Sequence, residues 1–110
     1  MSLYLFQASY TAAAVKAMID KPQDRLAVAS RNVEAAGGAV HSLYFAFGEH
    51  DVVGIGELPG NVDAVAFSMA TAATGAFSSF TMTPLLTSEE GVEAMKRAAP
   101  IAEGYAAPTG

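Results

Sequence analysis

The sequence has no cysteine, no tryptophan and few charged residues. Without cysteine the 110 residues form no disulfide, and a single domain of this length buries enough apolar surface to fold without one. The N-terminus lacks the basic stretch and uninterrupted apolar core of a signal peptide, and no apolar run approaches the roughly 20 residues of a membrane span. We therefore expect a cytoplasmic protein with no membrane partner.

Basic residues are also scarce. Six lysines and arginines stand against eleven acidic residues, which gives a net charge of −5. The basic residues are scattered among acids, whereas a phosphate backbone requires a basic stripe, so we expect no nucleic-acid partner. Charged residues make up 15% of the chain and hydrophobic residues 52%. So few charges predict that a second copy covers part of the surface, in a homodimer or a higher oligomer.

The apolar pattern predicts an α+β fold. Strands are expected at residues 2–9, 39–47, 52–58 and 76–86, and helices at 12–19, 25–36, 62–73 and 88–99. The short polar break at 48–51 joins the second and third strands as a hairpin. This order is that of a ferredoxin-like βαββαβ fold with a C-terminal helix, in which a four-stranded antiparallel sheet carries its helices on one face.

Both faces of the predicted sheet are apolar. In the first strand Leu3 and Leu5 point to one face, and Tyr4 and Phe6 point to the other. Helices cover only one face, so the second face requires another partner. The economical partner is a second copy packed sheet against sheet, which predicts a dimeric α+β barrel.

Polar residues and prolines mark the expected helix ends. The expected N-caps are Thr11, Asp24, Asn61 and Thr87. The third helix is expected to turn towards the sheet an inner face of Val62, Val65, Ala66 and Met69. Pro100 is expected to end the last helix, which divides the chain into a domain at residues 1–99 and a C-terminal tail at 100–110. Ile101 and Tyr105 are the residues that could hold this tail on its own subunit or on a neighbour.

Several short stretches occur in a fixed order: YLFQASYT at the start, GG before the second strand, FGEHDVV at the hairpin, ATGAF before the fourth strand and PLLTSEE after it. Together, from Tyr4 to Glu90, they resemble the GYD domain family, which is named for a Gly-Tyr-Asp signature. The resemblance implies a dimeric α+β barrel of ferredoxin-like halves and no established reaction. Gly48 and Asp51 match the signature, whereas His50 stands where a tyrosine is usual, so a role for that hydroxyl does not carry over.

The pair His50–Asp51 has two interpretations. In the catalytic one, the carboxylate orients the imidazole, which acts as a general base. In the structural one, Gly48 supplies a turn conformation that other residues resist, and Asp51 accepts hydrogen bonds from loop amides. The structural interpretation is favoured, because neighbours in an extended strand point to opposite faces. If the chain is an enzyme, we expect His50 to act as acid or base, Asp51 to orient the loop and Tyr44 to donate a hydrogen bond in the pocket.

Polar residues recur on single parities of the apolar strands. The candidate pocket residues are Gln7, Ser9, Ser42, Tyr44, Ser79 and Thr81. If they face the barrel interior, they supply the few polar groups of a small-molecule pocket. Alternatively, they bond one another or water across the dimer interface. Parity alone does not show which face points inward.

Two histidines without a third ligand make a poor metal site, so we predict no metal and no cofactor. Haem needs only one axial histidine and stays open as an alternative, although nothing selects for it. His41 is expected to be a structural residue on the side of Leu43 and Phe45. Motifs for a nucleophilic serine, a P-loop or a redox dithiol are absent.

The sequence thus predicts a small homo-oligomeric α+β barrel that binds a small, largely apolar molecule in the barrel. One alternative is a non-catalytic structural or ligand-sensing assembly module. Another is an enzyme similar to the cofactor-free monooxygenases and isomerases built on related barrels, an analogy of fold alone. A cavity reached past the hairpin favours ligand binding, and a filled interface favours the assembly module.

Overall fold

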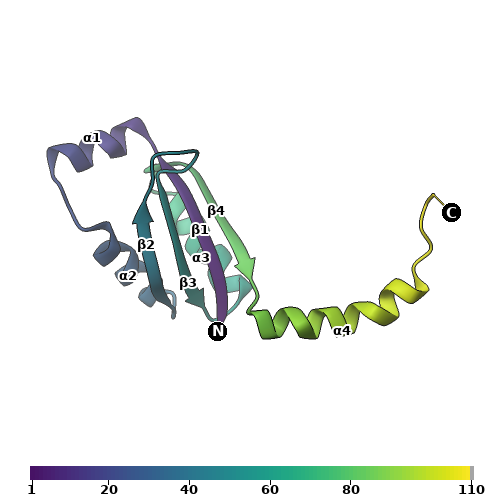
Figure 1. Cartoon of the computed structure of the whole chain (residues 1–110). Coiled ribbons are helices and arrows are strands. Elements are labelled where there is room, and N and C mark those ends of the chain that lie inside the picture. The colour runs from purple at the N-terminus through teal and green to yellow at the C-terminus, as the bar shows by residue number, and fades with distance from the viewer. Residues whose placement is uncertain (110) are drawn as a thin grey trace.

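The computed structural model describes residues 1–109, and these form one four-stranded antiparallel sheet with four helices (Figure 1). The strands lie in the order β2-β3-β1-β4. They are β1 (Ser2–Tyr10), β2 (Ala39–Phe45), β3 (Val52–Leu58) and β4 (Phe77–Leu85). The helices are α1 (Ala12–Asp20), α2 (Arg25–Ala35), α3 (Asn61–Ala72) and α4 (Ser88–Gly104). The predicted ferredoxin-like fold is confirmed, and the dimer stays a prediction.

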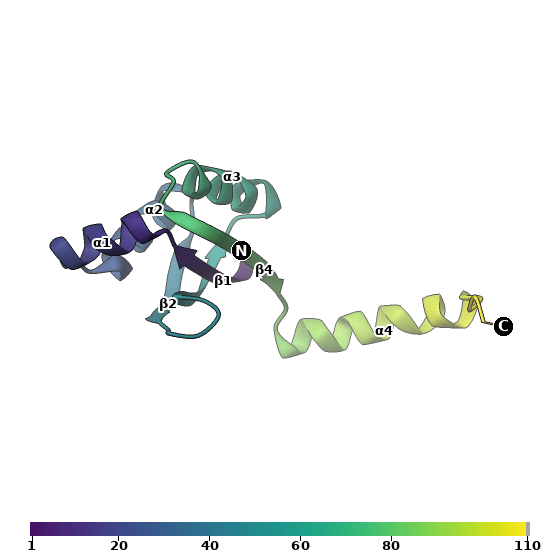
Figure 2. The ribbon, with the colours of Figure 1, turned by 90° about the horizontal axis from the view of Figure 1, so that it is seen from above.

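Helices α2 and α3 cover the same face of the sheet, which we call the helix face (Figure 2). Tyr4 and Ala8 of β1 and Leu58 of β3 are buried there. The opposite face, here called the open face, carries no helix in Figure 2. Strand register assigns to it Leu3, Leu5, Gln7, Ser9, Ser42, Tyr44, Val53, Ile55, Glu57, Ser79, Thr81, Thr83 and Leu85.

The core lies between the sheet and the two covering helices. Tyr4, Val33, Leu58 and Ala64 form its buried cluster, and Phe67 packs against it from α3. The Tyr4 hydroxyl donates a hydrogen bond of 2.7 Å to Asn61 Oδ1 at the start of α3. This bond gives a buried phenol a partner and fixes the first turn of α3 on β1.

Three of the four expected N-caps are confirmed. The side chains of Thr11 and Asp24 accept hydrogen bonds from backbone amides of α1 and α2, and Thr87 forms a capping box with Glu90 at α4. The fourth expectation is wrong, because Gly60 caps α3 and Asn61 is already its first residue. The Asn61 side chain instead accepts the bond from Tyr4 described above.

The expected inner face of α3 is wrong in part. Val62, Val65 and Met69 are exposed, whereas Ala66 lines the cavity described below. The residues of α3 packed in the core are Ala64 and Phe67. Since α3 is apolar on every side, its periodicity does not single out one face. Packing of the Phe67 ring against aromatic residues of the sheet selects the face instead.

Helix α4 continues through Pro100 to Gly104, so the expected end at Pro100 is wrong. Proline has a helical φ and removes only one backbone hydrogen bond, and water can solvate the freed carbonyl because α4 buries none of its residues. The helix extends away from the sheet in both views (Figures 1 and 2). Ile101 and Tyr105 are exposed, so they do not hold this segment on its own subunit. Contact of residues 100–109 with a neighbour stays a prediction.

Both outer strands of the sheet are irregular. Residue His41 is an extra residue in β2 relative to β3, and Ser78 is an extra residue in β4 relative to β1. In addition, Pro84 of β4 pairs with Tyr4. Its parity had placed His41 on the same face as Leu43 and Phe45. This expectation is wrong, because the bulge in β2 shifts His41 off that face. Within residues 1–109 no helix has both the length and the apolar character needed to cross a bilayer.

Candidate functional site

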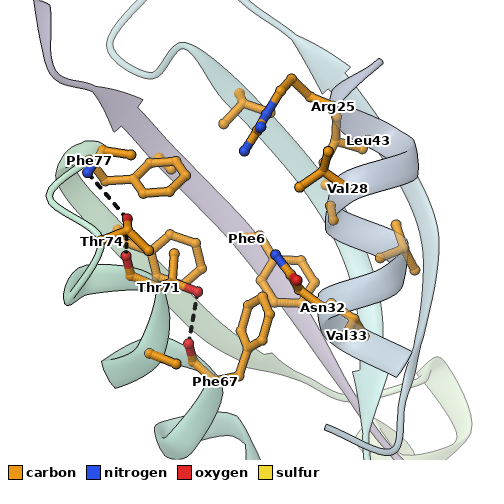
Figure 3. A pocket seen from close by; sticks show the side chains of 18 of the residues that line it. Phe6, Arg25, Val28, Asn32, Val33, Leu43, Phe67, Thr71, Thr74 and Phe77 are labelled. Atoms are coloured by element: carbon orange, nitrogen blue, oxygen red, sulfur yellow. Dashed lines mark hydrogen bonds between the residues drawn. The ribbon is translucent and has the colours of Figure 1, made fainter. Parts of the chain in front are cut away.

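A cavity of about 650 Å³ lies on the helix face, between α2 and α3 (Figure 3). The strands form its floor, with Phe6 and Ala8 from β1 and Gly54 from β3. Gly54 is required at this floor, because a Cβ there would lie 2.6 Å from the carbonyl oxygen of Ser42. The walls come from one side of α2 and one side of α3, and β2 and β4 also contribute residues. All four strands and two helices therefore build one site.

Aromatic rings dominate one side of the cavity. The rings of Phe6, Phe67 and Phe80 contact one another at centroid distances of 5.9 to 6.4 Å. Phe77 continues the cluster, 5.6 Å from Phe80 and 4.8 Å from Tyr10. Edge-to-face and offset contacts of this kind hold the rings in defined positions. The site therefore offers a preorganised apolar surface.

Few polar side chains reach the cavity, and most are already satisfied. Thr71 Oγ1 donates to the Phe67 carbonyl at 2.8 Å, and Thr74 Oγ1 donates to the Thr71 carbonyl at 2.7 Å. These hydroxyls serve the end of α3. The other polar residues that line the cavity are Tyr10 of β1 and Arg25 and Asn32 of α2. The side chains of Arg25 and Asn32 are directed towards the cavity in Figure 3. The site is thus an apolar cleft with one arginine at its end, which suits an apolar ligand.

None of the six predicted pocket residues lines this cavity. Gln7, Ser9, Ser42, Tyr44, Ser79 and Thr81 all lie on the open face, on the other side of the sheet. The structure brings them together on one surface, as their parities had suggested. Their role in a ligand site or in an interface between copies stays a prediction.

The hairpin between β2 and β3 curls towards the open face (Figure 2). Asp51 fixes it to the end of β1: its amide donates to the Ala8 carbonyl at 2.9 Å, and its Oδ2 accepts from the Tyr10 amide at 2.9 Å. Ser9 Oγ adds a bond of 3.3 Å to the Glu49 carbonyl. Asp51 therefore anchors this loop to the neighbouring strand β1. The sequence had suggested that the Asp51 side chain accepts from amides of the loop itself, whereas its partner is the amide of Tyr10 in β1.

Gly48 plays no conformational role of the expected kind. In residues 1–109 the glycines with positive φ are Gly37 and Gly75, and a Cβ at Gly48 meets no atom within 4 Å. Gly37, with a φ of 90°, directly follows Ala36, the C-cap of α2. The expectation that Gly48 holds a turn that other residues resist is wrong, because an exposed loop with open space on all sides admits any side chain.

The three candidate catalytic residues are not joined by hydrogen bonds. Asp51 is bound to Tyr10, and within residues 1–109 it makes no ion pair with His50. His50 Nδ1 is buried without a hydrogen-bond partner. Tyr44 lies on the open face with its side chain exposed. A catalytic role for these residues stays a prediction.

His41 faces a carboxylate on the open face. Its Nε2 lies 3.6 Å from Glu57 Oε2, a contact that the bulge in β2 makes accessible. In the part of the chain that the structure describes, no three histidine, aspartate or glutamate side chains gather as a metal site requires.

The cavity residues were missed because they are ordinary apolar residues. Nothing in Phe67 or Phe80 separates a cavity wall from a packed core, since both are apolar residues at core spacing. The one signal in the sequence is the place of Arg25 directly after the Asp24 cap, where an arginine can bind an anion but more often is a solvated surface charge.

Comparison with known proteins gives one match. Residues 4–95 match the GYD domain. Searches of the curated proteins and of the solved structures give no match. The match spans most of the 110 residues and includes β1 from Tyr4 onward, the other three strands and the hairpin anchored by Asp51. The chain belongs to the GYD domain family.

Proposed function

We propose that this protein binds a small, largely apolar molecule in the cavity between the sheet and helices α2 and α3. The observation that carries the proposal is the cavity itself, about 650 Å³ in volume and lined mainly by apolar and aromatic side chains. Ligand sites usually measure roughly 300–1,000 Å³ and combine an apolar lining with a few polar groups. The proposal moves the site from the barrel interior, where the sequence had suggested it, to the helix face.

We infer in addition that two copies pack open face against open face. Leu3, Leu5 and Val53 are only half-buried on this face, and Ile55 is more exposed still. Burial of apolar surface is worth about 25 cal/mol per Å², so pairing these residues favours association. The low content of charged residues agrees with a surface that is partly covered.

Ligand binding is tested with the apolar fluorophore N-phenyl-1-naphthylamine. Ala70 of α3 is exposed and lines the cavity, so Ala70→Phe places a ring in the site without disturbing the core. Ala72 is exposed on the same helix and does not line the cavity, so Ala72→Phe is the matched control. We expect the wild type and Ala72→Phe to enhance the fluorescence equally and Ala70→Phe to lose most of the enhancement. Equal enhancement by all three proteins contradicts this site.

Association is tested by native mass spectrometry and light scattering. We expect the wild type to be a dimer or a higher oligomer and Ile55→Asp to be a monomer, because a buried unpaired carboxylate opposes the interface. Val65 is exposed on α3, on the helix face, so Val65→Asp adds the same charge away from the open face and should leave the oligomer intact. A monomeric wild type overturns the inference.

A further inference from the structure

The cavity has one charged residue, and that residue lacks an acidic partner. Among the residues that line the cavity, Arg25 is charged and none is acidic. Within residues 1–109 Arg25 forms no ion pair. The nearest acid in the sequence, Asp24, accepts hydrogen bonds from the amides of Leu26 and Ala27 and serves as the cap of α2. The positive charge at this end of the cavity is therefore unneutralised.

One edge of the guanidinium donates a hydrogen bond, and within residues 1–109 the opposite edge makes none. Arg25 Nη1 donates to Gln23 Oε1 at 2.8 Å, and the guanidinium carbon lies 6.0 Å from the centre of the Tyr10 ring. These contacts hold the group in place. Nε of Arg25 is buried and has no hydrogen-bond partner. The Nε–H and the adjacent Nη2–H form the side of the guanidinium that binds a carboxylate with two parallel hydrogen bonds.

The apolar part of the cavity extends from Arg25 along α2. Arg25, Val28 and Asn32 follow one another on the side of α2 that faces the cavity (Figure 3). With a rise of about 1.5 Å per residue, this side spans about 10 Å from Arg25 to Asn32. The rings of Phe6 and Phe67 also line the cavity. The site thus has a cationic end and an apolar body.

Resting on the proposed function, we propose that the ligand of this cavity is an apolar carboxylate, whose head group binds the Nε and Nη2 edge of Arg25 and whose apolar body lies over the phenylalanine cluster. A buried donor without a partner is costly, and a carboxylate removes that cost with a charge-assisted pair of bonds. A neutral alcohol of the same apolar body offers one uncharged acceptor in place of the two charged oxygens, so it recovers less of this cost. The site should therefore distinguish the two by head group.

The test compares decanoate with 1-decanol, which share an apolar chain and differ in charge. Both displace N-phenyl-1-naphthylamine at pH 7.5, where a carboxylic acid is ionised. We expect the wild type to bind decanoate about tenfold or more tightly than 1-decanol. Arg25→Gln should abolish this preference while 1-decanol binding stays unchanged. Arg25→Lys should restore only part of it, because lysine keeps the charge without the planar pair of donors.

Arg31→Gln is the matched control, since Arg31 is exposed on the same helix and does not line the cavity. It should keep the preference of the wild type, and thermal denaturation of each variant verifies its folding. Equal affinities of the wild type for decanoate and 1-decanol, with both displacing the probe, overturn the carboxylate proposal and leave the proposed function standing. Failure of the probe to bind the wild type overturns the proposed function itself.

Discussion

Among the glycines that the structure describes, Gly38, at the entry to β2, has the least room for a side chain. A Cβ there would lie 1.9 Å from the carbonyl oxygen of Glu57 and 3.0 Å from a methyl group of Leu58. Glu57 cannot move away cheaply, because it is paired with Leu3 on one side and with Ala39 on the other. Gly38→Ala must therefore displace backbone that two strand ladders hold in place.

The expected loss is large for the addition of one methyl group. Overpacking costs roughly 1–3 kcal/mol, and a clash with backbone belongs at the upper end, so we expect Gly38→Ala to lose about 3 kcal/mol of unfolding free energy. For a domain of this size, such a loss lowers Tm by about 10 °C. Urea denaturation followed by far-ultraviolet circular dichroism measures it, at one fixed protein concentration because the proposed association would also stabilise the fold.

Gly48→Ala is the matched control for this prediction. Its Cβ meets no atom within 4 Å, so its unfolding free energy should stay within about 0.5 kcal/mol of the wild type. A Gly38→Ala protein that unfolds at the same urea concentration as Gly48→Ala refutes the argument. It would mean that the start of β2 is not held against Glu57 in solution.

Three further predictions concern single hydrogen bonds. Tyr4→Phe should lower the unfolding free energy by about 1 kcal/mol in urea denaturation. When Asn61→Ala is already present, Tyr4→Phe should cost nothing further, because its hydrogen-bond partner is gone. Equal costs of Tyr4→Phe with and without Asn61→Ala rule out a hydrogen bond between the two side chains. Asp51→Ala should lose about 2 kcal/mol, because the bond to the Tyr10 amide carries a charge, and a loss below 0.5 kcal/mol contradicts the anchor. Thr87→Ala should speed amide hydrogen exchange in the first turn of α4 and leave the urea midpoint of the sheet unchanged, since α4 buries no residue; a shifted midpoint shows that α4 packs on the fold.

Local signals in the sequence were sufficient for most element boundaries. Thr11, Asp24 and Thr87 cap their helices because a short polar side chain before an apolar helical segment binds free amides at short range. Gly37 ends α2 by its left-handed conformation. These interactions involve neighbours in sequence, so the sequence alone shows them.

Long-range features were not accessible in the same way. The extra residue His41 in β2 is apparent only once β2 is paired with β3, and it reverses the face predicted from parity. The orientation of α3 depends on where Phe67 finds aromatic partners, and the passage of α4 through Pro100 depends on its exposure. The cavity likewise depends on the spacing between α2 and α3, which no periodicity of either helix contains.

The irregular outer strands limit how copies of this protein can join. An unbroken outer strand is a template on which strands of other molecules add, and repeated addition produces aggregates. Here the bulge at His41 interrupts the regular pairing of β2. The bulge at Ser78 interrupts β4, and Pro84 in the same strand has no amide hydrogen to donate to an added strand. Both edges of the sheet therefore oppose the addition of further strands. The association that we propose, open face against open face, uses neither edge.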